Sequence, residues 1–141
     1  MRAACIIYHK NIARYPARWV DKCVSSIQNQ TYKNFKVFEF CYGSDMEKIW
    51  KFQSDQVRHE YHHVPLPNHV FAENSCIEIA YKNNYDYFFI VNLDDIYDIS
   101  RIEKQLMVLN AGYDLVSSDF VRFYENNDTQ EFKMSVFNLG E

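Results

Sequence analysis

Short apolar runs and stretches with apolar residues at helical spacing alternate along the chain. The runs are typical of strands that are buried on both faces of a sheet. They predict strands over residues 3–8, 35–40, 57–64, 87–91 and 115–118. The helical spacing predicts helices over residues 17–27, 46–53 and 72–81, and a last helix between Ser100 and Gly112. This alternation predicts an α/β fold: one Rossmann-like domain with a mainly parallel sheet flanked by helices.

Local signals mark where some of these elements begin and end. Ser100 and Glu103 have the spacing of a capping box, which predicts the start of the last helix. Gly112 is a good helix stop. Apolar residues over 120–124 and 132–137 enclose a polar turn, so we expect a hairpin there. Neither a repeat nor a linker divides the chain, and we expect one domain over residues 1–141.

The apolar run over residues 87–91 stops at Asn92, Asp94 and Asp95. Adjacent carboxylates repel each other, and a divalent cation relieves that repulsion. In open parallel sheets, ligands bind beyond the carboxyl ends of the strands. That rule gathers four strand ends at one edge, over residues 9–11, 41–45, 92–95 and 118–119. We expect the chemical centre there; the alternative is that the two aspartates merely close a strand with solvated charge.

The net charge, the apolar segments and the cysteines of the chain limit which partners and which cellular compartment we expect. A net charge of -4 argues against binding to nucleic acid or to an anionic membrane, both of which need a basic surface. The sequence shows no segment apolar enough to span a bilayer and no signal peptide. Its four cysteines are widely spaced, so we expect reduced, mostly buried thiols in a cytoplasmic protein.

Several familiar motifs are missing. The sequence contains no GxGxxG, no GxxxxGK[ST] and no GxSxG. Carboxylates and polar loop ends remain, and they suit a substrate with a diphosphate, because a metal bridges carboxylates and phosphate oxygens. His59, His62 and His63 resemble a metal cluster, but on a strand His62 faces away from the other two. A zinc site is therefore the less favoured interpretation.

Seven short segments follow one another in an order that is typical of a known enzyme family. They are Ser26-Ile27 with Gln30-Thr31-Tyr32, Asn34-Phe35-Lys36-Val37, Gly43-Ser44-Asp45, Ala72-Glu73-Asn74, Asn92 to Ile96, Arg101 to Gln105 and Asp114-Leu115-Val116. Over about residues 4–119, this order resembles the N-terminal, nucleotide-sugar-binding part of family 2 glycosyltransferases, which have the GT-A fold. The order of the matches carries the resemblance more than any single match does.

The resemblance implies an inverting glycosyltransferase that moves a sugar from a nucleotide-diphosphate sugar to a glycan, lipid or protein acceptor. Asp95 would be the direct ligand of Mn²⁺ or Mg²⁺, and Asp94 would lie beside it, near the ribose and diphosphate. The other residues expected to bind the donor are His9, Lys10, Asn11, Tyr42, Ser44 and Asn74.

The sequence departs from the family at three points. Cys41 and Tyr42 stand where the family carries an aspartate pair, and Glu73 stands where arginine is usual. No residue matches the family's catalytic base, so two interpretations as an enzyme stay open: a part that lacks the acceptor side, or a divergent minimal enzyme. Two alternatives to an enzyme stay open. One is an inactive nucleotide-sugar-binding module; the other is an interaction domain that forms a homodimer through residues 132–137.

Overall fold

The structure is a computed structural model that describes residues 2–43, 57–65, 68–118, 120–125 and 132–137. The chain divides into two compact units, Met1–Leu106 and Met107–Glu141. The prediction of one domain over residues 1–141 stays a prediction. The helix expected over residues 46–53 lies outside the described residues.

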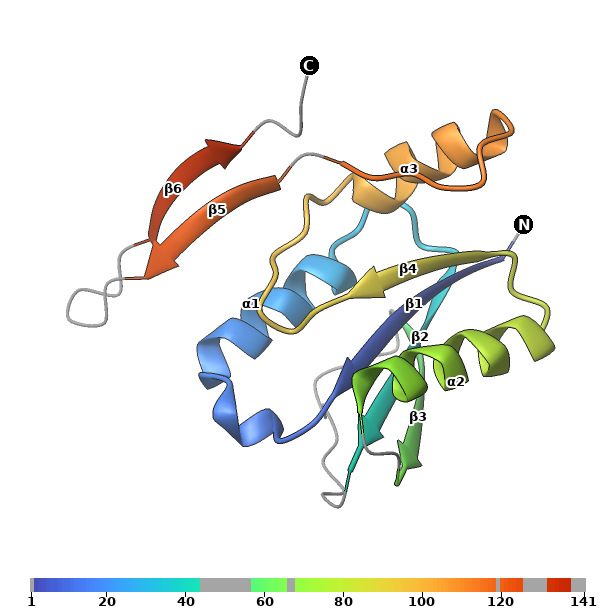
Figure 1. Cartoon of the computed structure of the whole chain (residues 1–141). Helices are drawn as coiled ribbons and strands as arrows, with labels where there is room; N and C mark the ends of the chain where they lie inside the picture. Colours follow the sequence, from blue (N-terminus) through green and yellow to red (C-terminus); the bar gives the residue numbers. More distant parts are fainter. Residues whose placement is uncertain (1, 44–56, 66–67, 119, 126–131, 138–141) are drawn as a thin grey trace. The chain divides into compact units, whose positions relative to one another are not determined.

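The first unit is built on a four-stranded sheet in which every pairing is parallel (Figure 1). The strand order is β3-β2-β1-β4, so β1 lies between β2 and β4. The strands are β1 (Ala3–His9), β2 (Phe35–Tyr42), β3 (Arg58–Val64) and β4 (Tyr87–Val91). The predicted α/β, Rossmann-like architecture with a mainly parallel sheet is therefore confirmed.

Helices lie on both faces of this sheet. The helices are α1 (Ala17–Gln28), which follows the short 3-10 helix η1 (Ile12–Arg14), α2 (His69–Lys82) and α3 (Arg101–Asn110). Figure 1 shows α1 and α2 on opposite faces of the sheet. The helical spacing of apolar residues over 17–27 gives α1 its inward side, where Val20, Cys23, Val24 and Ile27 are buried. Ser26 is buried as well, although its side chain is polar.

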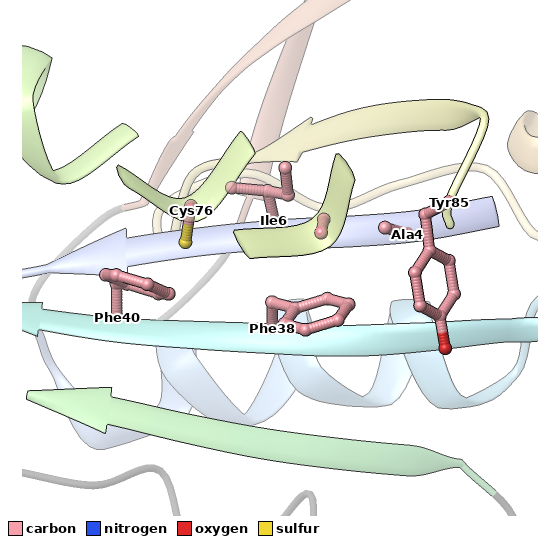
Figure 2. Close-up of a cluster of buried hydrophobic side chains, with 7 residues drawn as sticks. Ala4, Ile6, Phe38, Phe40, Cys76 and Tyr85 are labelled. Atoms are coloured by element: carbon pink, nitrogen blue, oxygen red, sulfur yellow. The ribbon is translucent and has the colours of Figure 1, made fainter. Parts of the chain in front are cut away.

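The face of the sheet that α2 covers is an apolar core (Figure 2). The ring of Tyr85 meets that of Phe38 edge-on, with 5.3 Å between the ring centroids. Side chains on a strand alternate between the two faces, so Phe38 and Phe40 turn toward α2 while Glu39 turns toward the other face. The buried members of this core are Ala4, Ile6, Phe38, Phe40, Cys76, Ala80 and Tyr85.

The opposite face holds a buried charged residue near the middle of β2. Glu39 is fully buried, and its carboxylate oxygens accept hydrogen bonds from His9 Nε2 at 2.8 Å and from His59 Nε2 at 2.6 Å. His9 lies on β1 and His59 on β3, so this buried triad joins three adjacent strands. A buried carboxylate without donors costs several kcal/mol, and the two imidazoles supply those donors.

A second glutamate-centred group, the edge triad, lies on the α2 side of the sheet. Glu60 on β3 accepts hydrogen bonds from Lys36 and from His62 Nε2. The ammonium of Lys36 lies 4.9 Å from the centre of the Phe38 ring, and the His62 ring stacks on Phe40. The side chains of Lys36, Glu60 and His62 all remain 22–33% exposed, so water reaches them.

The second unit contains the predicted hairpin. β5 (Phe120–Glu125) and β6 (Phe132–Phe137) pair antiparallel, with Phe120 opposite Phe137. The strand expected over residues 115–118 is not formed, and Leu115 is 85% exposed. A short apolar run becomes a strand only when another strand pairs with it, and among the described residues none pairs with this segment.

The start of α2 also differs from the prediction. The helix begins at His69, three residues before the predicted start, because Asn68 caps it. The side-chain oxygen of Asn68 accepts hydrogen bonds from the backbone N–H groups of Val70 and Phe71, at 3.1 and 3.2 Å. Asparagine is a favoured residue at this position.

Candidate functional site

The two aspartates follow β4 at the carboxyl edge of the parallel sheet. Leu93 is buried and anchors the turn, whereas Asp94 and Asp95 are both exposed. The backbone N–H of Asp95 donates to the carbonyl oxygen of Asn92 at 3.2 Å, which closes the turn. The turn therefore presents two carboxylates to solvent at the edge where ligands of α/β sheets bind.

One oxygen of Asp95 is held by two neighbours. Its Oδ2 accepts hydrogen bonds from the side-chain amide of Asn92 at 3.2 Å and from the Tyr97 hydroxyl at 3.3 Å. The same hydroxyl accepts a hydrogen bond from the backbone N–H of Asn92 at 2.8 Å. Burial raises the pKa of Tyr97, so its hydroxyl keeps the proton that it donates.

The end of α1 fastens the segment that follows the aspartates. Ser26 Oγ accepts a hydrogen bond from the backbone N–H of Tyr97 at 3.1 Å and donates one to the carbonyl oxygen of Cys23 at 2.7 Å. The buried side-chain amide of Gln30 donates to the carbonyl oxygen of Asp98 at 2.8 Å and accepts from the N–H of Ile102 at 3.0 Å. These contacts give a physical reason for the Ser26 and Gln30 motif: it ties α1 to the turn and to α3.

The predicted capping box is wrong in its partners. The backbone N–H and the hydroxyl of Ser100 both donate to the Asp98 carboxylate, and Glu103 accepts a hydrogen bond from the Thr31 hydroxyl at 2.8 Å. α3 still begins directly after Ser100. Asp98 competes for Ser100 because its side chain reaches the backbone two residues on, as aspartate commonly does in turns.

Three tyrosines lie at the same edge, and one of them, Tyr15, interacts electrostatically with Asp94. Burial raises the pKa of Tyr15, and the charge of Asp94 raises it further. Burial likewise raises the pKa of Tyr8. The nearby Glu73 carboxylate, to which the Tyr8 hydroxyl donates a hydrogen bond, raises this pKa further. Tyr42 interacts electrostatically with both of these tyrosines. The ends of β1 and β2 thus contribute aromatic hydroxyls to the edge of the sheet at which the turn after β4 lies.

The other residues expected to bind the donor are spread over this edge. His9 is buried and bonded to Glu39, so a ligand contact through its ring would require rearrangement. Lys10 is exposed, and its side chain lies over Gly43: a Cβ at Gly43 would come within 3.0 Å of Lys10 Cε. Asn11 adopts a left-handed backbone conformation with φ 55°.

The last two residues expected to bind the donor are Asn74 and Ser44. Asn74 is exposed on α2, one position after Glu73, and Ser44 lies outside the described residues. The structure thus brings Lys10, Tyr42 and Asp94 to one edge of the sheet. That each of them binds a donor stays a prediction.

The three histidines near residue 60 have separate partners. His59 bonds Glu39, His62 bonds Glu60, and the Nε2 of His63 donates to the carbonyl oxygen of Gly43 at 3.0 Å. The four cysteines are free and buried, as predicted. Burial raises the pKa of the Cys5 and Cys23 thiols to about 12, so neither is a ready nucleophile.

Sequence reasoning missed Tyr8, Tyr15, Tyr97 and Glu39. A signal existed for Glu39, because a lone carboxylate inside an apolar strand requires a donor. A shallow pocket of about 430 Å³ lies elsewhere, between α1 and residues 96–99. Tyr97 borders this pocket, but none of the predicted donor-binding residues lines it.

The donor set at the turn fits a hard divalent cation. Mg²⁺ and Mn²⁺ prefer oxygen ligands and commonly take one or two carboxylates, with water and substrate phosphates completing the shell. Asp94 and Asp95 supply such carboxylates. Within the described residues, no group of three or more His, Cys, Asp or Glu side chains converges on one point.

The fold has relatives among solved structures. The chain is similar to three crystal structures of TarS from S. aureus. TarS 1-349 in complex with UDP-GlcNAc matches with a TM-score of 0.61 and 12% identity, over 79% of this chain and 32% of that chain. TarS 1-349 matches with a TM-score of 0.61 and 10% identity, over 79% and 33%. A third TarS structure gives 0.57 and 13%, over 79% and 20%.

The fold is glycosyltransferase-like. The chain spans about a third of the length of the TarS 1-349 structures that it matches. No family model matches the chain, and no curated protein matches its sequence. Among the described residues, no helix combines the length and the apolar character that crossing a membrane requires.

Proposed function

We propose that the chain is the donor-binding part of a glycosyltransferase that inverts the anomeric centre of the transferred sugar. It would bind a nucleotide-diphosphate sugar through Mn²⁺ or Mg²⁺. One observation carries the proposal: Asp94 and Asp95 follow β4 at the ligand-binding edge of a parallel sheet whose fold is like that of TarS. Because one TarS structure is a complex with UDP-GlcNAc, a uridine diphosphate sugar is the first donor to test.

Different residues at this edge would bind the cation, the base or sugar, and the phosphates of such a donor. Asp95 and Asp94 would hold the cation, which supplies positive charge to the departing nucleoside diphosphate. Tyr15 interacts electrostatically with both Asp94 and Tyr42, and the two aromatic rings would provide surfaces for a base or a sugar. Lys10 adds an ammonium to this edge, and an ammonium attracts phosphate as a point charge.

Thermal unfolding of the full chain tests the proposal. UDP-GlcNAc and other nucleotide sugars are added with and without Mn²⁺. A ligand at about 100 times its Kd stabilises the folded state by about 2.7 kcal/mol, so Tm should rise by roughly 10 °C. We expect this rise for at least one donor, and only with Mn²⁺ present.

Asp95→Asn is the decisive variant, because it keeps the shape of the side chain and removes its charge. We expect it to abolish the metal-dependent rise, while Asp114→Asn, at an exposed aspartate of the second unit, behaves like wild type. Absence of a metal-dependent rise with every donor would refute donor binding. A rise that survives Asp95→Asn would refute the assignment of the metal ligand.

A specific observation favours a second candidate, a nucleotide-sugar-binding module without transferase activity. At the end of β2, Cys41 is fully buried and Tyr42 is half-buried, where the resembling family places two aspartates. A rise in Tm without release of nucleoside diphosphate, in the presence of a panel of acceptors, would favour the module. Release of the diphosphate that depends on Asp95 would favour the enzyme.

A further inference from the structure

The hydrogen bonds around Asp95 are unequal on its two carboxylate oxygens. Oδ2 accepts from the Asn92 amide and from the Tyr97 hydroxyl. No hydrogen bond from the described residues reaches Oδ1. A carboxylate with one oxygen occupied in this way has a fixed plane and one oxygen left for a further partner.

Tyr97 is itself held at three points. Its backbone N–H donates to Ser26 Oγ at 3.1 Å, and its hydroxyl accepts from the N–H of Asn92 at 2.8 Å. The guanidinium of Arg101 lies over its ring, 4.2 Å from the ring centre. Arg101 is fixed in turn, since it donates to the carbonyl oxygen of Ile90 at 3.1 Å. These contacts therefore give the hydroxyl a defined position beside Asp95.

We infer that Tyr97 is a positioning residue for metal binding: its hydroxyl, together with the Asn92 amide, occupies Oδ2 of Asp95 and directs Oδ1 toward the cation. This inference rests on the proposed function, since it assumes that Asp95 is the ligand. Groups that hydrogen-bond to metal ligands orient them, and removing such a group typically weakens metal binding 10- to 100-fold. The 3.3 Å contact is long, so we expect an effect at the lower end of that range.

The test is a titration of the full chain with Mn²⁺, alone and with UDP, in which free Mn²⁺ is followed by electron paramagnetic resonance. We expect Tyr97→Phe to raise the Kd for Mn²⁺ about tenfold. Tyr81→Phe is the matched control, because Tyr81 is 71% exposed near the far end of α2. It should bind Mn²⁺ like wild type, and Asp95→Asn should not bind it measurably.

Melting without metal separates positioning from folding. Two hydroxyl contacts at the exposed turn are lost, the one to Asp95 and the one from the N–H of Asn92. At about 1 kcal/mol for each hydrogen bond, the Tm of metal-free Tyr97→Phe should fall by no more than about 8 °C. Asn92→Ala is the second route, since it removes the other donor to Oδ2, and we expect it to raise the Kd about fivefold.

The outcomes distinguish the two claims. If wild type binds Mn²⁺, Asp95→Asn does not, and both Tyr97→Phe and Asn92→Ala bind like wild type, the positioning role is refuted while the proposed function stands. If Tyr97→Phe loses its metal-free stability and Asn92→Ala binds normally, the hydroxyl is only structural and the inference is again refuted. If wild type binds no Mn²⁺ with or without UDP, the proposed metal site is refuted, and the inference with it.

Discussion

The buried triad and the edge triad place the same chemistry in two environments. In each, one glutamate accepts hydrogen bonds from two basic side chains. Glu39 is fully buried, whereas the Glu60 side chain is 33% exposed on an outer strand. Glu39 depends entirely on protein donors, while water replaces lost donors at Glu60. The comparison teaches that the surroundings of an ion pair, rather than its geometry, set what its loss costs.

The largest effect is expected from removing the buried charge. Glu39→Gln keeps the size of the side chain, but one amide cannot accept from both imidazoles as the carboxylate does. Breaking a buried pair costs 3–5 kcal/mol, and the amide retains part of the bonding, so we expect the unfolding free energy to fall by about 3 kcal/mol. Urea unfolding followed by circular dichroism measures this. A fall below about 1 kcal/mol would make the two triads equivalent.

Removing one donor of the buried triad should have a smaller effect. His59→Gln leaves the His9 bond in place and offers an amide donor in a different position. One hydrogen bond to a charged group contributes about 1.5–3 kcal/mol, so we expect a loss of about 2 kcal/mol in the same urea experiment. A double-mutant cycle with Glu39→Gln should show strong non-additivity, and simple addition of the two losses would contradict a shared network.

The edge triad should tolerate the matching change. Glu60→Gln alters a partly exposed group, and exposed pairs contribute about 0.2–1 kcal/mol, so we expect a loss of about 0.5 kcal/mol. In 1 M NaCl, where screening acts over about 3 Å, this difference should shrink toward zero, while the effect of Glu39→Gln persists. Equal salt dependence of the two variants would contradict the difference in exposure.

Acid should remove the remaining contribution of Glu60. The hydrogen bond from Lys36 holds the pKa of Glu60 below its ordinary 4.5, so the folded chain binds this proton less readily than the unfolded chain. The stabilisation is present above pH 4.5 and is lost as the pH falls below it. The stability difference between wild type and Glu60→Gln should therefore shrink as the pH falls below 4.5, until it is within about 0.3 kcal/mol. A difference that grows on acidification would reverse this assignment.

The elements predicted best are those with a strong local pattern. The run over residues 87–91 is β4, and the stripe of α1 is the buried side of that helix. Both patterns are contained within a few consecutive residues, which is why sequence alone reveals them. The strand over residues 115–118 failed because pairing is a property of two segments, and one segment carries no information about its partner.

The sequence predicted where the candidate site lies, but it did not predict the hydrogen bonds that the site residues make. Asp94 and Asp95 lie at the expected edge, since strand direction and topology fix where the strands end. His9 does not face that edge: the alternation of β1 places it on the α1 side, where it meets Glu39 thirty positions later. Tyr97 could not be assigned, because its role depends on a hydroxyl that reaches back to Asn92 and Asp95 in space.

The strand order also has a consequence for synthesis of the chain. β1 is made before the other three strands of the sheet, yet it lies in the interior of the sheet, with Ala3 opposite both Phe35 and Tyr87. One edge of β1 therefore has no partner until the ribosome has made β4, on the order of ten seconds later. Nascent chains that stop before Tyr87 expose that edge, and we expect them to be the species that chaperones must protect.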